Sequence, residues 1–491
     1  MGALHAEALN IFARQTQALA TSLRVRDLVR GPIAIRLLIL WACFSGALLI
    51  NRGPIYFPDT TAYIRIADAA AISIGLPASA WSDRLAEMRG GIQLTARPSP
   101  TPLSGRSVYY GFALWLLGTL GAALAQGLLA AGAVVLAAQR LKLPFALLPA
   151  IVLLSSATVF AALLMPDLLA ALAILSCAMI LPHWQDMSRI ERVFWWGLLV
   201  ASVVSHTATL LIVAAILTIW ALWRRGGLSW LPVLTTLIVG VAAELSFVGG
   251  VNHVTGSPPL RPPFLSARLI ADGPGRAFLD EQCPRRADFT LCRFYGALPT
   301  NSDAILWTEN GGGFISMSRD VQRAWSQEDL RFTAAVAADR PLAVGVSSAL
   351  AVAKQAFGYK VSEVTQPLGQ TDRLTEKELA RYSATAIARS SFPVWIWNGA
   401  SPPLLIVSLM LLIGAWRRLP LSAQIIILGV IMDVAICGAL STPHDRYLMR
   451  VAWLLPLAAL TVRPSWLGKN SATPSTAKTP LTSSAPNSAE P

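Results

Sequence analysis

The feature that most constrains this chain is a series of long, continuously apolar runs, the first of which spans 33–50. A helix needs about 20 apolar residues to cross the hydrocarbon core of a bilayer, and several runs approach that length. Hydrophobic residues make up 54% of the 491 positions and charged residues only 14%, whereas soluble proteins carry about 25% charged residues. The runs do not alternate in polarity as barrel strands do. The sequence therefore predicts an all-α polytopic membrane protein.

Basic residues set the expected topology. The net charge is +13, and in a membrane protein an excess of Lys and Arg is typical of cytoplasmic loops, so we expect no nucleic-acid partner. We therefore expect about ten transmembrane helices in a bacterial-type inner (plasma) membrane, with both termini in the cytoplasm. This topology places every basic cluster on one side of the membrane. These clusters lie at 24–36, 139–142, 189–192, 224–225, 417–418 and 463–469.

The count of ten depends on the run 193–223. As one helix it would be about 46 Å long at 1.5 Å per residue, which exceeds a hydrocarbon core of about 30 Å. Because Arg192 precedes the run and Arg224 follows it, charge bias favours two short helices that meet at 205–207. A single helix would instead invert everything that follows.

This threading predicts five regions. They are a cytoplasmic amphipathic segment at 1–30, helices one to seven at 31–250 with a first external loop at 51–107, an extracytoplasmic domain at 251–395, helices eight to ten at 396–463, and a disordered cytoplasmic tail at 464–491. Gly- and Pro-rich turns between helical patterns indicate that the domain at 251–395 is small and α-rich or mixed.

Two of the five cysteines stand apart from the others. Cys283 and Cys292 lie nine positions apart in the large polar segment, which suits a disulfide if the compartment is oxidising. The other three lie in apolar runs and are expected to be inert. No CxxC pair accompanies Cys283 and Cys292, so the sequence does not support a metal site.

The outer face collects most of the notable polar residues. Asp59 lies in the stretch NRGPIYFPDTTAY, where it either caps a helix or serves as a general base at the membrane surface. Asp167, in Met-Pro-Asp, has the same capping alternative, but an ionisable group so close to hydrocarbon is a functional candidate. His206 sits at the expected break, where it lines a cavity or bonds to a neighbouring carbonyl.

A second polar cluster precedes the last helix, at His444, Asp445, Arg446 and Tyr447. The fork of an arginine matches phosphate oxygens, although an arginine that snorkels beside a tyrosine anchor would look the same. Arg52 and Arg106 flank the first loop and could either reach the same phosphate or contact headgroups. Tyr63 is a further candidate for the substrate pocket.

These motifs resemble the GT-C class of integral-membrane glycosyltransferases. The resemblance rests on Asp59 in FPDTTAY, on SGRSVYYG before the second helix, on Met-Pro-Asp before the fourth, and on Arg446-Tyr447. It covers about 33–250 and 398–463, but not 251–395. No second acidic residue stands beside Asp59, so the cofactor stays unknown and a divalent metal is not supported.

The resemblance implies inverting transfer of a sugar from a lipid-linked donor, a polyprenyl phosphate, on the extracytoplasmic face. Asp59 would activate an acceptor of unknown identity, with Asp167 as the other candidate catalytic residue. Arg446, helped by Arg106 or Arg52, would stabilise the departing phosphate, and membrane lipids would surround a groove for the carrier tail. The external domain would select the acceptor.

Other functional classes remain open. A transporter or flippase for a lipid-linked saccharide would need charges deep in several spans and an internal repeat, and the sequence indicates neither. A non-catalytic assembly factor for an envelope polysaccharide would tolerate loss of Asp59. An O-acyltransferase would need a catalytic histidine within a span, which His206 matches only in part.

Overall fold

The computed structural model describes residues 32–76, 105–223, 228–308, 312–369, 371, 374 and 376–462. Within this part of the chain helices predominate, and the only β-type pairing is an isolated bridge between Ile55 and Leu163. The segment expected at 1–30 and the tail expected at 464–491 lie outside the described residues, as do residues 77–104 of the first external loop.

Five described helices are long and apolar enough to cross a membrane, or six if one sharply bent pair counts as a single span. The five are α7 (Val108–Leu141), α10 (Asp167–His183), α13 (Leu231–Thr255), α20 (Trp395–Gly414) and α21 (Leu421–Leu440). The bent pair is α17 (Arg319–Asp339) with α18 (Pro341–Ala356). These helices bear out an α-helical membrane protein, but they do not confirm ten spans.

Other apolar runs form short or broken helices. The run 33–50 divides into α3 (Ile33–Phe44) and α4 (Gly46–Asn51), and 144–164 divides into η1 (Phe145–Leu147), α8 (Leu148–Leu154) and α9 (Ala157–Ala162). The last run divides into α22 (Asp445–Ala452) and α23 (Leu454–Ala459). Broken helices are tolerated at membrane depth where protein surrounds them, and the α8–α9 residues are largely buried.

The ambiguous run 193–223 also divides, and it does so where the sequence predicted. Helix α11 (Arg189–Ser205) ends at His206, whose extended backbone (φ −153°, ψ 118°) separates it from α12 (Thr207–Trp223). The His206 Nδ1 atom accepts a hydrogen bond from the Ala208 amide at 3.2 Å. This bond satisfies one of the amides left free at the start of α12.

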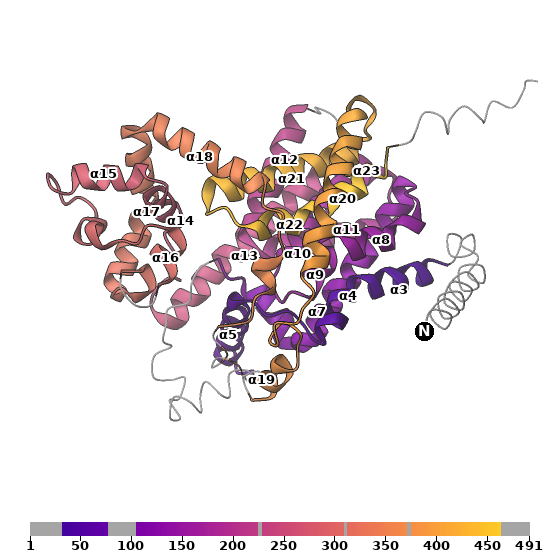
Figure 1. The fold of residues 1–491 in the computed structure, drawn as a ribbon, viewed down its shortest axis with the longest axis horizontal. Helices are drawn as coiled ribbons and strands as arrows, with labels where there is room; N and C mark the ends of the chain where they lie inside the picture. Colours follow the sequence, from indigo (N-terminus) through magenta and orange to yellow (C-terminus); the bar gives the residue numbers. More distant parts are fainter. Residues whose placement is uncertain are drawn as a thin grey trace, which may run out of the picture.

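Two hydrophobic cores divide the molecule into a body and a lobe (Figure 1). In the body α10 is the most enclosed of the five long helices, with 83% of its apolar window buried. The lobe is built from α14 (Phe264–Ala271), α15 (Pro274–Gln282), α16 (Ser302–Trp307) and α17. Helix α18 runs from the lobe to the body, where it packs against α21 (Figure 1).

The lobe is smaller than the extracytoplasmic domain expected at 251–395. Its buried core extends from Leu260 to Val336. The later residues Val361, Leu374 and Tyr382 are buried in the core of the body instead. This part of the chain includes η6 (Ser362–Thr365) and α19 (Glu376–Ser383). The buried core of the lobe therefore ends before the C-terminal limit that polar composition indicates.

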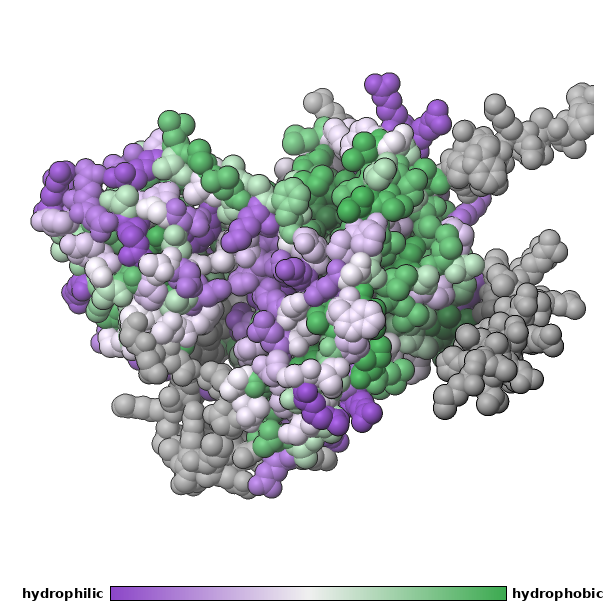
Figure 2. All heavy atoms as spheres, in the orientation of Figure 1, coloured by the Kyte–Doolittle hydropathy of each residue, from purple (hydrophilic) through white to green (hydrophobic). Residues whose placement is uncertain are grey.

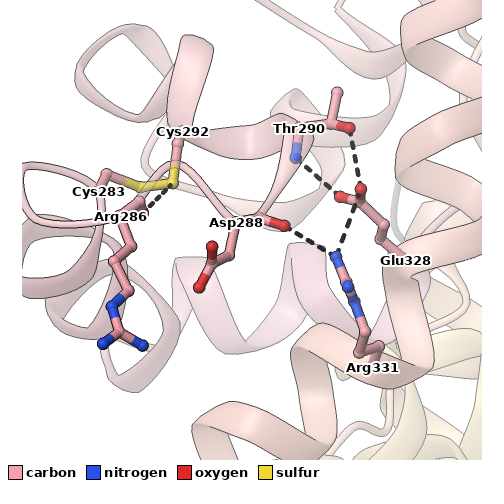
Figure 3. Close-up of a disulfide and its surroundings, with 7 residues drawn as sticks. All are labelled: Cys283, Arg286, Asp288, Thr290, Cys292, Glu328 and Arg331. Atoms are coloured by element: carbon pink, nitrogen blue, oxygen red, sulfur yellow. Dashed lines mark hydrogen bonds and ion pairs between the residues drawn. A yellow bond between two sulfur atoms is a disulfide. The ribbon is translucent and has the colours of Figure 1, made fainter.

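A disulfide closes the loop 283–292 of the lobe, and two side chains of α17 bind that loop (Figure 3). Cys283 and Cys292 are bonded, with their Cα atoms 5.1 Å apart. Beside them Glu328 accepts hydrogen bonds from the amide and hydroxyl of Thr290 at 2.8 and 3.1 Å. Arg331 pairs with Glu328 at 3.6 Å and donates to the Asp288 carbonyl at 2.8 Å. The loop 283–292 is thus fastened to α17.

The surface differs in character between the two parts (Figure 2). Apolar residues cover most of the visible face of the body, whereas hydrophilic residues cover much of the lobe and gather where it meets the body. An apolar belt on long helices suits contact with lipid, since hydrocarbon offers no partner for polar groups.

Candidate functional site

The bridge at Ile55 brings two loops together at one end of the body. The Ile55 amide donates to the Ala162 carbonyl at 2.8 Å, and the Leu164 amide donates to the Ile55 carbonyl at 2.9 Å. Five residues further along, in the first turn of the next helix, the Thr60 hydroxyl donates to the Leu164 carbonyl at 3.0 Å. These bonds hold the start of α5 (Pro58–Ser73) beside the start of α10.

Asp59 lies in the first turn of α5, but it does not cap that helix. The N-cap position belongs to Phe57, whose amide donates to the Thr60 hydroxyl at 3.0 Å. Asp59 instead accepts a hydrogen bond from Arg106, with 2.7 Å between Oδ1 and Nη2. The two side chains are 21% and 18% exposed. Arg106 uses one nitrogen here, and its buried Nε has no hydrogen-bond partner among the described residues.

The start of α7 fixes the position of Arg106. Ser107 is the N-cap, and its hydroxyl accepts hydrogen bonds from the amides of Tyr109 and Tyr110. The same hydroxyl donates to the Val204 carbonyl at 2.7 Å. Because Val204 lies two residues before His206, this bond places Arg106 near the break between α11 and α12.

Arg446 faces the same end of the body from α22. Its guanidinium carbon lies 4.7 Å from the centre of the Phe57 ring and 5.0 Å from that of Tyr447. Nη2 donates to the Tyr447 hydroxyl at 3.3 Å, whereas the buried Nε and Nη1 have no hydrogen-bond partner among the described residues. Glu363 Oε1 is 3.7 Å from Nε. The charges of Asp59 and Asp167 both act on Arg446.

Tyr63 and His206 lie among these charged groups. Tyr63 is buried on α5 and meets Tyr110 edge to face, with 5.2 Å between ring centres. Its backbone packs so closely on α7 that a Cβ atom at Gly111 would lie 2.3 Å from the Tyr63 carbonyl oxygen, so only glycine fits there. Asp59, Arg106, Asp167 and Arg446 interact electrostatically with Tyr63. All of these except Asp59 also act on His206.

Asp167 joins a buried ionic group that sequence reasoning missed. Arg450 Nη1 lies 3.4 Å from Asp167 Oδ1, and Arg450 Nη2 lies 2.6 Å from Asp433 Oδ1. All three side chains are at most 1% exposed. Neither the Asp167 nor the Asp433 Oδ2 atom has a hydrogen-bond partner among the described residues.

This group shows that the expectation of no deeply buried charges was wrong. Arg450 was not among the residues singled out from the sequence, but α22 begins at Asp445 and carries Arg450 into the core. Asp433 interrupts the apolar helix α21. An acidic residue inside a span is rare without a function or a partner, so its position in the sequence could have indicated a buried ion pair.

His444 lies where the lobe meets the body and contacts both parts. Its Nδ1 lies 3.1 Å from Glu363 Oε1, and its Nε2 lies 3.6 Å from Asp303 Oδ1 on α16. Burial disfavours the imidazolium, but hydrogen bonds to Asp303 and Glu363 outweigh it and raise the pKa of His444 to about 10. The Thr442 and Ser302 hydroxyls also share a hydrogen bond across this contact. Glu363, which sequence reasoning missed, therefore links His444 to Arg446.

The remaining candidates point elsewhere. Asp445 lies against Gly358 and accepts a hydrogen bond from the Lys360 backbone. Arg52 ends α4 in a left-handed conformation (φ 59°), and its side chain is exposed. Within the part of the chain that the structure describes, Arg52 takes part in none of the ion pairs around Asp59.

The site therefore consists of Asp59, Tyr63, Arg106, His206 and Arg446, with the Asp167–Arg450–Asp433 group behind it. Two cationic forks with unused N–H groups can bind an anion such as a phosphate. Among the described residues, no group of three or more His, Cys, Asp and Glu side chains is placed to hold a metal ion. Comparison of the chain with protein-family models, with curated proteins and with solved structures finds no match.

Proposed function

We propose that this protein is a membrane glycosyltransferase that moves a sugar from a polyprenyl-phosphate donor to an acceptor on the extracytoplasmic face. The observation that carries the proposal is Arg446. Its buried guanidinium has two nitrogens, Nε and Nη1, without a hydrogen-bond partner among the described residues, and Glu363 at 3.7 Å from Nε is its only carboxylate neighbour there within 4 Å. Buried N–H groups without acceptors are costly, and a bound ligand would supply the missing acceptors. The planar fork of arginine matches phosphate oxygens, and Phe57 and Tyr447 hold it in place.

The reacting groups have separate roles in this proposal. The acceptor hydroxyl forms a bond to the anomeric carbon while the bond from that carbon to the phosphate oxygen breaks. The hydroxyl proton passes to Asp59, and the bonding electron pair leaves with the phosphate, whose charge Arg446 and Arg106 stabilise. Arg106 occupies only Oδ1 of Asp59, so Oδ2 is the oxygen that receives the proton.

The surroundings of the site suit a lipid-linked donor. The body presents an apolar surface on which a polyprenyl tail can rest (Figure 2). Polar residues gather where the lobe meets the body, and a glycan or other polar acceptor would approach from there. In this proposal the lobe selects the acceptor through the side on which His444 pairs with Asp303 and Glu363.

A second candidate function has its own support. The Asp167–Arg450–Asp433 group places three ionisable side chains deep in the body, and such groups mark substrate or proton pathways in transporters. A transporter or flippase for a lipid-linked saccharide would move its substrate across the bilayer without breaking the sugar–phosphate bond. The two functions therefore differ in whether free polyprenyl phosphate appears.

The test is a reconstitution in lipid vesicles with a panel of polyprenyl-phosphate sugars and candidate acceptors. We expect wild-type protein to release polyprenyl phosphate and Asp59→Asn to lower that rate about 100-fold or more, the contribution of a general base. Asp445→Asn is the matched control, because Asp445 is also an aspartate in the first turn of a helix, α22, but accepts a hydrogen bond from the Lys360 backbone. Movement of an intact donor across the bilayer, with no cleavage and no effect of Asp59→Asn, would support the transporter instead.

A further inference from the structure

A cavity of about 710 Å³ lies at the end of the body opposite to Asp59 and Arg446. The same elements connect the two ends: α7 follows Arg106 and carries Arg140 in its last turn, and α10 begins at Asp167 and ends at His183. Arg140 and His183 both line the cavity. Its volume is typical of sites that hold a small organic molecule.

The lining combines cations with apolar side chains. Arg140, Lys142 and Arg418 supply positive charge, and no acidic residue lines the cavity within the described part of the chain. Arg140 is bound by both carboxylate oxygens of Glu191 at 3.0 Å. Lys142 and Arg418 are exposed and form no ion pair among the described residues. Two cations at this cavity are therefore uncompensated.

The apolar part of the lining continues onto the lipid-facing surface. Met410 and Leu411 lie near the end of α20 and are 67% and 49% exposed. Only 22% of the apolar window of α20 is buried inside the protein. A molecule in the cavity can therefore place hydrocarbon chains against α20 while its head lies beside the cations.

The backbone at Lys142 is also unusual. This residue ends α7 in a left-handed conformation (φ 54°, ψ 43°), where its amide bonds to the Ala138 and Gln139 carbonyls. Glycine or asparagine adopts this conformation more readily than lysine. Lysine is therefore not the residue that this backbone conformation favours, and Lys142 lines the cavity.

We propose that this cavity binds an anionic phospholipid, with its phosphate between Lys142 and Arg418 and its acyl chains along Met410 and Leu411. The lipid is a bound partner at the face opposite to the proposed transfer site and takes no part in the transfer. Negative lipid charge complements the two unpaired cations, and the amphiphilic form of the lipid matches the two-part lining.

The test measures binding of phosphatidylglycerol and phosphatidylcholine to the purified full-length protein by native mass spectrometry. We expect wild type to prefer phosphatidylglycerol and Arg418→Gln to weaken its binding about fivefold, the effect of one cation near an anionic lipid. Arg417→Gln removes the same charge one position away but outside the lining, so its effect should stay within about twofold. Lys142→Asn keeps a residue that tolerates positive φ and should weaken binding as Arg418→Gln does.

Three results would overturn the proposal. Equal binding of phosphatidylcholine and phosphatidylglycerol would remove the role of charge. Equal losses in Arg417→Gln and Arg418→Gln would show diffuse surface attraction rather than a site. Displacement of phosphatidylglycerol by a lower concentration of a polyprenyl phosphate would make the cavity a carrier site instead.

Discussion

Asp59 Oδ1 and Arg106 Nη2 lie 2.7 Å apart, which joins residues on opposite sides of the first external loop. The pair ties the start of α5 to the start of α7, next to the helix break at His206. It also keeps a positive charge beside a carboxylate that is only one-fifth exposed. In the proposed transfer reaction, this arrangement orients Asp59 and supplies a second cation to the departing phosphate.

The first prediction concerns the partner of Asp59. Arg106→Gln should lower the rate of polyprenyl-phosphate release about tenfold or more, because the carboxylate loses the group that orients it and the phosphate loses a cation. Arg106→Lys should lower this rate less, because lysine keeps the positive charge but lacks the planar fork of arginine. Arg52→Gln is the control, because Arg52 is exposed and is not part of the Asp59–Arg106 ion pair. Equal rates for Arg52→Gln and Arg106→Gln would argue against a role for the ion pair.

The second prediction concerns the buried ionic group. Asp433→Leu removes the closer partner of Arg450, so the free energy of unfolding should fall by about 3 kcal/mol or more. Asp433→Leu combined with Arg450→Met should cost more than Asp433→Leu alone, because Asp167 then stays buried without its cation. Unfolding in mixed detergent micelles titrated with SDS measures both.

A control for that experiment is Asp272→Asn in the lobe. Asp272 pairs with Arg268 at 3.0 Å but is 30% exposed, so its loss should cost at most about 1 kcal/mol. If Asp433→Leu costs no more than Asp272→Asn, the buried group does not stabilise the body.

The third prediction concerns pH. The pKa of His444 is raised to about 10 by Asp303 and Glu363, above an unfolded value of about 6.5. The stabilisation from this contact is therefore fully present below about pH 6.5 and is lost as pH rises through about 10. Arg446 and Tyr447 also face this group, and Arg446 should stay charged over this range.

The measurement is the distance between spin labels on α16 and α21 from pH 6 to pH 10. In wild type the lobe should separate from the body toward high pH, whereas His444→Gln should show no such change. The pKa values of Asp303 and Glu363 are lowered, so the contact should also weaken when strong acid protonates them. An identical alkaline response in His444→Gln would exclude His444 as its cause.

The fourth prediction concerns the disulfide. The Cys283–Cys292 bond closes a loop over a sequence separation of nine, and its loss should destabilise the lobe by about 2.5 kcal/mol through loop entropy. Hydrogen exchange should therefore speed up in α15 and at 284–295 in Cys283→Ser, but not in α10. Cys43→Ser, which alters a free thiol of the body, should leave exchange in the lobe unchanged. Unchanged exchange in Cys283→Ser would mean that the core and the Glu328 bonds suffice.

Much of the fold was predictable because it depends on local pattern. The apolar runs at α7, α10, α13 and α21 predict helices, and the charges around 193–223 predict the break at His206. The number of spans was not predictable in this way. Breaks such as that between α8 and α9, around Ser155, come from packing and tertiary hydrogen bonds, and a hydropathy pattern does not report these.

The site was predictable in part for the same reason. Asp59 and Arg106 border one loop, so their approach follows from sequence order. The contact of Arg446 with Phe57 and Glu363 depends on how α22 enters the body, which no local pattern specifies. Arg450 was missed because helix α22 begins earlier than its polar sequence indicates.

The central claim is that Arg446 binds the phosphate of a lipid-linked donor, and the most direct measurement is binding of a polyprenyl phosphate to the purified protein. The account predicts that Arg446→Gln weakens this binding about tenfold or more, the value of charge-assisted hydrogen bonds to phosphate, while Arg52→Gln leaves it unchanged. Equal binding to wild type and Arg446→Gln, in protein that unfolds at the same temperature, would contradict the account.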